Sequence, residues 1–141
     1  MVNPSYFKNP KQGMAFTALA EPFSNFIFAF VVLLICYPLF GSNIVSGSAM
    51  DYLTDFLWVL FSINIVLGIF NLIPIPPLDG SKVFAILLPE SAYFRFINFK
   101  YGFIVLIVLI YTGLTSNIIE PFMTVMYRGY FSIIERIYSF L

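Results

Sequence analysis

An aspartate and three prolines follow an apolar run that is long enough to span a lipid bilayer. The segment reads Asn71-Leu-Ile-Pro-Ile-Pro-Pro-Leu-Asp79-Gly80. An ionised carboxylate at membrane depth costs about 2.5–3.5 kcal/mol on insertion scales, so such residues pair, bind ions or line wet cavities. Two interpretations of Asp79 stay open. It caps the helix that follows, or it points into a polar cavity as a ligand for a cation.

The other residue types that build metal centres are scarce in this chain. It has no histidine, and Cys36, its only cysteine, lies in an apolar setting that suits a small buried side chain. Asp51 and Asp55 are four residues apart, but they fall in a loop that we predict on the side opposite Asp79. The residues alone therefore supply one candidate metal ligand, Asp79.

Composition determines the class of protein that must position this carboxylate. Apolar residues make up 60% of the chain and charged residues 10%, with a mean hydropathy of +0.93, which indicates an integral membrane protein. A chain of 141 residues fits a single membrane domain over residues 1–141. The lipid bilayer is therefore the expected partner. Seven basic and seven acidic side chains cancel, so nucleic acid is not an expected partner.

Three apolar runs predict transmembrane helices over residues 23–40, 56–73 and 101–114, and the third reaches 119 if the Thr115-Ser-Asn interruption is tolerated. Pro22 lies near the start of the first, where a missing amide proton is tolerated, and prolines end the second. Between the runs we predict a loop over 41–55, a short helix over 82–88 and a connector over 90–100.

Residues 121–141 repeat apolar side chains at helical spacing, set against Arg128, Glu135 and Arg136. Such a helix lies in the membrane interface or docks on the bundle, and we favour the interface because docking would bury two arginines. The predicted fold class is an all-α membrane protein with about three transmembrane helices plus a C-terminal amphipathic, interfacial helix. Basic residues precede the first span and follow the second, and none lies between the two, so the Asp79 loop is predicted to face the cytoplasm.

The segment Phe70-Asn-Leu-Ile-Pro-Ile-Pro-Pro-Leu-Asp-Gly-Ser-Lys-Val83 resembles the second signature of the site-2 protease family, the intramembrane zinc metalloproteases also called peptidase family M50. The opening Asn3–Lys11 and the stretch Met14–Asn25 are similar to the compact bacterial and archaeal members. Leu88-Pro89, Tyr101-Gly-Phe103 and Thr112-Gly113 fit the same subgroup, so the resemblance covers essentially the whole chain. It implies a multi-pass protein of a prokaryotic cell membrane.

The family resemblance implies a zinc ion held by two histidines of a His-Glu-x-x-His helix and by the aspartate that corresponds to Asp79. Three such ligands leave a fourth position for the water that attacks the peptide bond, with the motif's glutamate as general base. The resemblance also places Asn71 and Asn25 near the site, where they would help to bind a substrate helix in extended form. An interhelical hydrogen bond is an equally open role for each asparagine.

The sequence departs from the family at two points. It contains no His-Glu-x-x-His segment, and Glu21 stands before Pro22 where relatives generally have glycine. Glu21 either crowds and recharges the mouth of the cavity or is a solvated acid in the first turn of its helix.

The chain begins where the middle of the family's sequence begins. We therefore expect it to be the C-terminal portion of a site-2 type zinc metalloprotease, inactive as it stands, with no stoichiometric zinc of its own. Its expected partners are the missing N-terminal half or a transmembrane substrate. A non-catalytic pseudoprotease that binds transmembrane helices is the main alternative. A transporter or ion-binding protein is a third, and it is disfavoured because no second interrupted helix mirrors the first.

Overall fold

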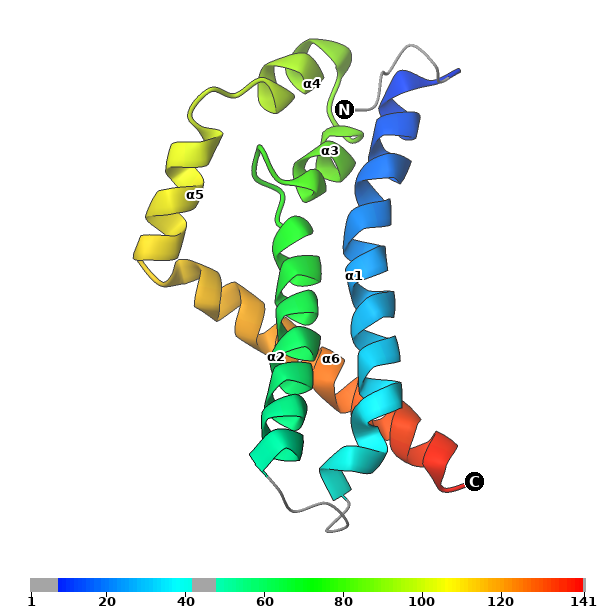
Figure 1. Ribbon diagram of the computed structural model, residues 1–141. Coiled ribbons are helices and arrows are strands. Elements are labelled where there is room, and N and C mark those ends of the chain that lie inside the picture. Colours follow the sequence, from blue (N-terminus) through cyan, green and yellow to red (C-terminus); the bar gives the residue numbers. More distant parts are fainter. Residues whose placement is uncertain (1–7, 42–47, 141) are drawn as a thin grey trace.

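The computed structural model describes residues 8–41 and 48–140, and this part of the chain is helical without any strand. The all-α prediction is therefore confirmed. The helices, shown in Figure 1, are α1 Pro10–Gly41, α2 Ser48–Asn71, α3 Asp79–Ala85, α4 Glu90–Ile97, α5 Gly102–Tyr111 and α6 Leu114–Tyr138.

Helices α1 and α2 lie side by side and form the membrane-spanning centre of the molecule (Figure 1). Both are long and apolar enough to cross a bilayer. Their interface buries Leu33, Phe61 and Ile65 completely. Gly68 allows the close approach, because a Cβ at that position would overlap the ring of Phe26.

Both spanning helices begin earlier than the apolar runs predicted. Helix α1 begins at Pro10 rather than near residue 23, so Pro22 lies inside the helix, where it is fully buried. Helix α2 begins at Ser48, which places Asp51 and Asp55 in helix rather than in the predicted loop. Residues 42–47 of that loop lie outside the described residues. The apolar runs mark the segments suited to the hydrocarbon core, and a helix of 32 residues is about 48 Å long, well beyond its thickness of about 30 Å.

The predicted third span is bent. Helix α5 has ten residues, about 15 Å, and cannot cross a bilayer alone. Helices α4 and α5 together are long and apolar enough to form one membrane span, which is bent by 56° between them. The described part of the chain thus holds two to three spans, in agreement with the prediction of about three. Helix α4 lies in the region predicted as a connector, and Gly113, with φ of 73°, separates α5 from α6.

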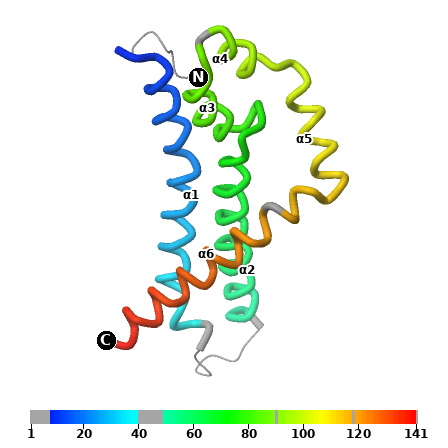
Figure 2. Tube along the Cα trace, turned by 180° about the vertical axis from the view of Figure 1, so that it is seen from behind, coloured from blue at the N-terminus to red at the C-terminus, as the bar shows by residue number. Residues whose placement is uncertain are grey.

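Helix α6 is the predicted C-terminal amphipathic helix, although it begins at Leu114 rather than near residue 121. It crosses α1 and α2 obliquely on one face of the pair, as seen from opposite sides in Figures 1 and 2. Ile134 is fully buried there, while Arg128 and Arg136 stay exposed. The helix therefore docks on the bundle without burying the arginines, which removes the reason for favouring a purely interfacial position.

Two tyrosine hydroxyls attach α6 to the backbone of α1. Tyr130 Oη donates to the Phe26 carbonyl at 2.9 Å, and Tyr138 Oη donates to the Leu34 carbonyl at 2.7 Å. Trp58 of α2 contacts the same helix through aromatic rings, because its ring centroid lies 5.9 Å from that of Tyr127. These contacts hold α6 against both spanning helices.

Candidate functional site

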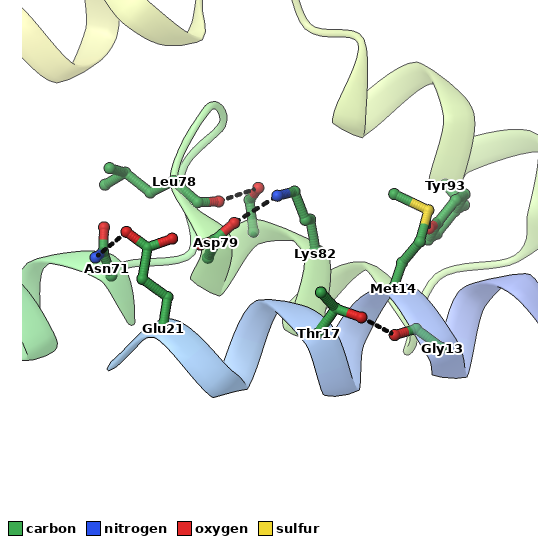
Figure 3. A network of polar contacts seen from close by, with 10 residues as sticks. Gly13, Met14, Thr17, Glu21, Asn71, Leu78, Asp79, Lys82 and Tyr93 are labelled. Atoms are coloured by element: carbon green, nitrogen blue, oxygen red, sulfur yellow. Dashed lines mark hydrogen bonds and ion pairs between the residues drawn. The ribbon is translucent and has the colours of Figure 1, made fainter. Parts of the chain in front are cut away.

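The chain reverses direction between α2 and α3, and this reversal places the candidate carboxylate beside α1. Residues 72–78 join the two helices, and we call them the proline-containing segment. Prolines at 74, 76 and 77 exclude a continuous helix there. The segment instead forms short turns, one of which is closed by a hydrogen bond from Leu78 N–H to Ile75 O at 2.9 Å. Helix α3 then packs along the first half of α1, as Figure 1 shows. Asn71 at the end of α2 and Asp79 at the start of α3 therefore face the same part of α1 (Figure 3).

Two glycines fix the position of the proline-containing segment by close backbone approach. A Cβ on Gly80 would overlap the carbonyl of Leu72, and a Cβ on Gly102 would overlap the carbonyl oxygen of Pro76. Gly80 brings α3 against the end of α2, and Gly102 brings the first turn of α5 against the turn. Gly80 thus brings the two ends of this segment together and Gly102 holds its middle, both by contacts that only glycine permits.

Asp79 is the first residue of α3, and its side chain is 15% exposed. Its carboxylate forms an ion pair with the ammonium of Lys82, one turn further along the same helix. The interpretation of Asp79 as a helix cap is wrong, because the N-cap is Leu78 and no side chain caps α3. A carboxylate in the first turn is still favourable there, since it faces the positive end of the helix dipole.

Glu21 joins Asn71 to Asp79, and Figure 3 shows the arrangement. The Asn71 amide Nδ2 donates to Glu21 Oε1 at 3.3 Å. The Glu21 carboxylate also lies beside that of Asp79. We call these four residues, Glu21, Asn71, Asp79 and Lys82, the polar network. It links α1, α2 and α3, and Glu21 sits well inside α1, so its interpretation as a first-turn acid is wrong.

The structure separates the two asparagines implied by the resemblance. Asn71 belongs to the polar network and makes an interhelical hydrogen bond, one of the two roles that the sequence left open. Asn25 lies one turn beyond Glu21 on α1 and is half-buried. No hydrogen bond between described residues joins the Asn25 side chain to the polar network. The substrate-binding role of each asparagine stays a prediction.

Sequence reasoning overlooked Lys82 as a partner of Asp79. We predicted the short helix to begin at residue 82, and that boundary hid the spacing of three residues that places both side chains on one helix face. A helix beginning at Asp79 would have indicated the ion pair. Glu21 was recognised as unusual, but its partners became visible only once the chain reversal was known.

The residues around Asp79 do not fit a zinc ion. A catalytic zinc site uses three protein ligands and keeps one position open for water. Across residues 8–41 and 48–140 no three histidine, cysteine, aspartate or glutamate side chains are grouped to hold a metal, and the sequence has no histidine. Lys82 already balances the charge of Asp79. The described residues of this chain therefore do not complete a catalytic zinc site.

An apolar pocket of about 300 Å³ lies between α1, α2, α6 and the proline-containing segment. One of its lining residues, Leu72, directly follows Asn71 in the sequence. Its walls are large apolar side chains from all three helices and from the segment that leads to Asp79: Phe26, Ile69, Leu72, Ile73, Pro74, Phe122 and Met126. The pocket offers space for apolar side chains beside the segment that leads from α2 to Asp79.

Comparison with known proteins places these features in a family. The model of peptidase family M50 matches residues 42–116, which include Asn71, the proline-containing segment and Asp79. The chain is 34% identical over 123 residues to "Putative zinc metalloprotease YwhC" of Bacillus subtilis (strain 168), covering 85% of this chain and 56% of that protein. It is also 34% identical over 116 residues to "Zinc metalloprotease MJ0392" of Methanocaldococcus jannaschii, covering 79% of this chain and 32% of that protein.

No solved structure matches the chain. The chain spans about half the length of the first relative and about a third of the second. The family match nevertheless covers more than half of the chain and includes the proline-containing segment and Asp79. The apolar helices of the chain also agree with a family of integral membrane proteins. The chain therefore belongs to peptidase family M50.

Proposed function

We propose that this chain is the C-terminal portion of an intramembrane zinc metalloprotease of family M50. In the complete protein it would supply one zinc ligand, Asp79, and part of the surface that holds a transmembrane substrate. Support comes from the match over residues 42–116 and from two relatives whose names describe zinc metalloproteases. The segment that carries Asp79 is held against both spanning helices, as a ligand position requires.

We further propose that the chain does not hydrolyse peptide bonds by itself. The observation that carries this proposal is the donor set: Asp79 is joined by Glu21 and Lys82, and the chain contains no histidine. One or two carboxylates do not hold zinc usefully against water. Two histidines and the general base would have to come from another segment, supplied in the complete protein or by a separate polypeptide.

The substrate surface would combine the apolar pocket with Asn71 and Asn25. The pocket would accept apolar side chains of a transmembrane segment, and the asparagine amides would bind its backbone where it is unwound. The site would lie in the cell membrane of a prokaryote with the Asp79 end towards the cytoplasm. That orientation follows from the basic residues near the predicted spans, because Lys8 and Lys11 precede the first span and Lys82, Arg95 and Lys100 follow the second.

Reconstitution with a separate membrane segment that carries a His-Glu-x-x-His helix tests the proposal. Together the two polypeptides should cleave a transmembrane reporter peptide, and Asp79→Ala in this chain should abolish the cleavage. The matched control is Asp55→Ala, which removes a carboxylate at the other end of α2 and should leave cleavage unchanged. Cleavage that survives Asp79→Ala would remove Asp79 from the zinc site.

A second candidate function is a pseudoprotease that binds transmembrane helices without cutting them. The ion pair between Asp79 and Lys82 favours it, because the carboxylate is neutralised without any metal. Under this function the chain accumulates intact in membranes and copurifies with a single-span partner. A chain that is degraded unless the histidine-bearing segment is present would instead favour the peptidase half.

A further inference from the structure

We propose that Glu21 is a built-in latch that occupies one N–H of the Asn71 amide and keeps that N–H from a substrate. This inference rests on the proposed substrate-binding role of Asn71. A transmembrane segment would have to displace Glu21 before its backbone carbonyl could accept the same hydrogen bond. The latch therefore regulates access to the site from within the chain.

The hydrogen bond itself is the first argument. Asn71 Nδ2 donates to Glu21 Oε1 at 3.3 Å, and the acceptor is a carboxylate. The N–H of Nδ2 that points at the carboxylate is not available to a peptide carbonyl, and a charged acceptor competes well against a neutral one. Because Nδ2 carries two N–H groups, Glu21 should weaken the binding of a ligand whose carbonyl approaches the same N–H.

The surroundings of Glu21 allow the latch to open. Its side chain is exposed, so it can rotate away without disturbing the core, whereas the adjacent Pro22 is fully buried and keeps the backbone in place. The latched position brings two carboxyl groups together, Glu21 and Asp79, which repel each other when both are ionised. The Lys82 ammonium beside Asp79 offsets that repulsion. One hydrogen bond and the Lys82 charge therefore favour the latched position of Glu21, while the Asp79 carboxylate opposes it. Such a weakly held side chain can be displaced by a substrate.

Binding of a synthetic peptide measures the latch directly. The probe is a dansyl-labelled, lysine-flanked peptide of about 20–25 leucine and alanine residues with a central Gly-Pro break, in phosphatidylcholine nanodiscs with the protein. Energy transfer from Trp58, the only tryptophan, reports binding. Glu21→Ala should tighten binding about threefold to fivefold, the equivalent of one interhelical hydrogen bond in a membrane. Asn71→Ala should weaken binding, and Glu21→Ala should have no effect in that background.

Two further variants keep the test decisive. Glu120→Ala removes an exposed acid on α6 outside the polar network and should leave affinity unchanged. Glu21→Gln keeps the size and an acceptor oxygen but loses the charge, so it should tighten binding less than Glu21→Ala does. Glu21→Gln also serves alone if the alanine variant does not fold, as judged by circular dichroism.

The outcomes separate the latch from the proposed function. If Asn71→Ala weakens binding while neither Glu21 variant tightens it, the latch is overturned and the substrate role of Asn71 stands. If Asn71→Ala leaves affinity unchanged both in the wild-type chain and in the Glu21→Ala variant, the substrate role itself fails, and the latch fails with it.

Discussion

Asn71, the last residue of α2, donates a hydrogen bond of 3.3 Å to Glu21 of α1, which lies 50 residues earlier in the chain. The bond sits where the chain leaves α2 and turns towards Asp79. It adds a side-chain link between the start of that turn and α1, beside the close backbone approaches at Gly80 and Gly102. The polar network thus contributes to the position of the segment that carries Asp79.

The coupling between these two residues should be measurable by a double-mutant cycle. Glu21→Ala and Asn71→Ala should each lower the free energy of unfolding, and the double variant should lose less than the sum. We expect a coupling energy of about 0.6–1 kcal/mol, typical of interhelical hydrogen bonds in membranes. Thermal unfolding in detergent micelles followed by circular dichroism provides the values. Strict additivity of the two losses would show that the bond contributes nothing to stability.

The glycines beside the proline-containing segment should not tolerate a methyl group. Gly80→Ala and Gly102→Ala place a Cβ against the backbone carbonyl of Leu72 or Pro76, and we expect each to destabilise the fold by about 1–3 kcal/mol. Gly129→Ala is the control, because nothing lies within 4 Å of the added Cβ. It should stabilise α6 slightly, since alanine is the better helix former. Equal unfolding temperatures for all three variants would contradict the close approaches.

Removal of the Lys82 charge should leave Asp79 beside Glu21 without a compensating cation. Lys82→Met should lower the free energy of unfolding by about 1–2 kcal/mol, a partly buried pair being worth less than a fully buried one. Adding Asp79→Asn to Lys82→Met should restore part of this loss. Lys100→Met, at an exposed position, is the control and should change stability by less than about 0.5 kcal/mol. A larger loss in the double variant than in Lys82→Met would rule out charge compensation.

The docking of α6 depends on two tyrosine hydroxyls that meet carbonyls of α1. Tyr130→Phe and Tyr138→Phe should each cost about 1 kcal/mol, because one hydrogen bond to the backbone is lost with little change in shape. Trp58 fluorescence should report the loosening through the neighbouring rings of Tyr127 and Phe131. Tyr111→Phe, at a side chain that is 92% exposed, is the matched control. Unchanged unfolding and fluorescence in Tyr130→Phe and Tyr138→Phe would place the attachment of α6 elsewhere.

Local sequence patterns were enough to predict the membrane class, the two spanning helices and the amphipathic C-terminal helix. Long apolar runs and helical periodicity depend on neighbouring residues only. The first residues of α1 and α2 were harder to predict, because hydrophobicity indicates where a helix meets lipid and not where its backbone hydrogen bonds stop. Gly113 supplied a helix boundary inside the third apolar run that composition alone did not indicate.

The candidate site was predictable only in part. Asp79 could be singled out from its chemistry, since an ionisable residue at membrane depth is costly, whereas Asn71 followed from the family resemblance. The contact between Glu21 and Asn71 was not predictable, because it depends on how α2 packs against α1. The pocket was equally hidden, since α6 contributes Phe122 and Met126 to its wall.

The zinc content of the purified chain tests the central claim most directly. The protein would be purified in detergent, dialysed against buffered micromolar zinc and analysed by elemental mass spectrometry beside its Asp79→Ala variant. We predict zinc well below one equivalent in both samples, because Lys82 neutralises Asp79 and no histidine joins it. One equivalent of tightly bound zinc that disappears in Asp79→Ala would contradict this account of the site.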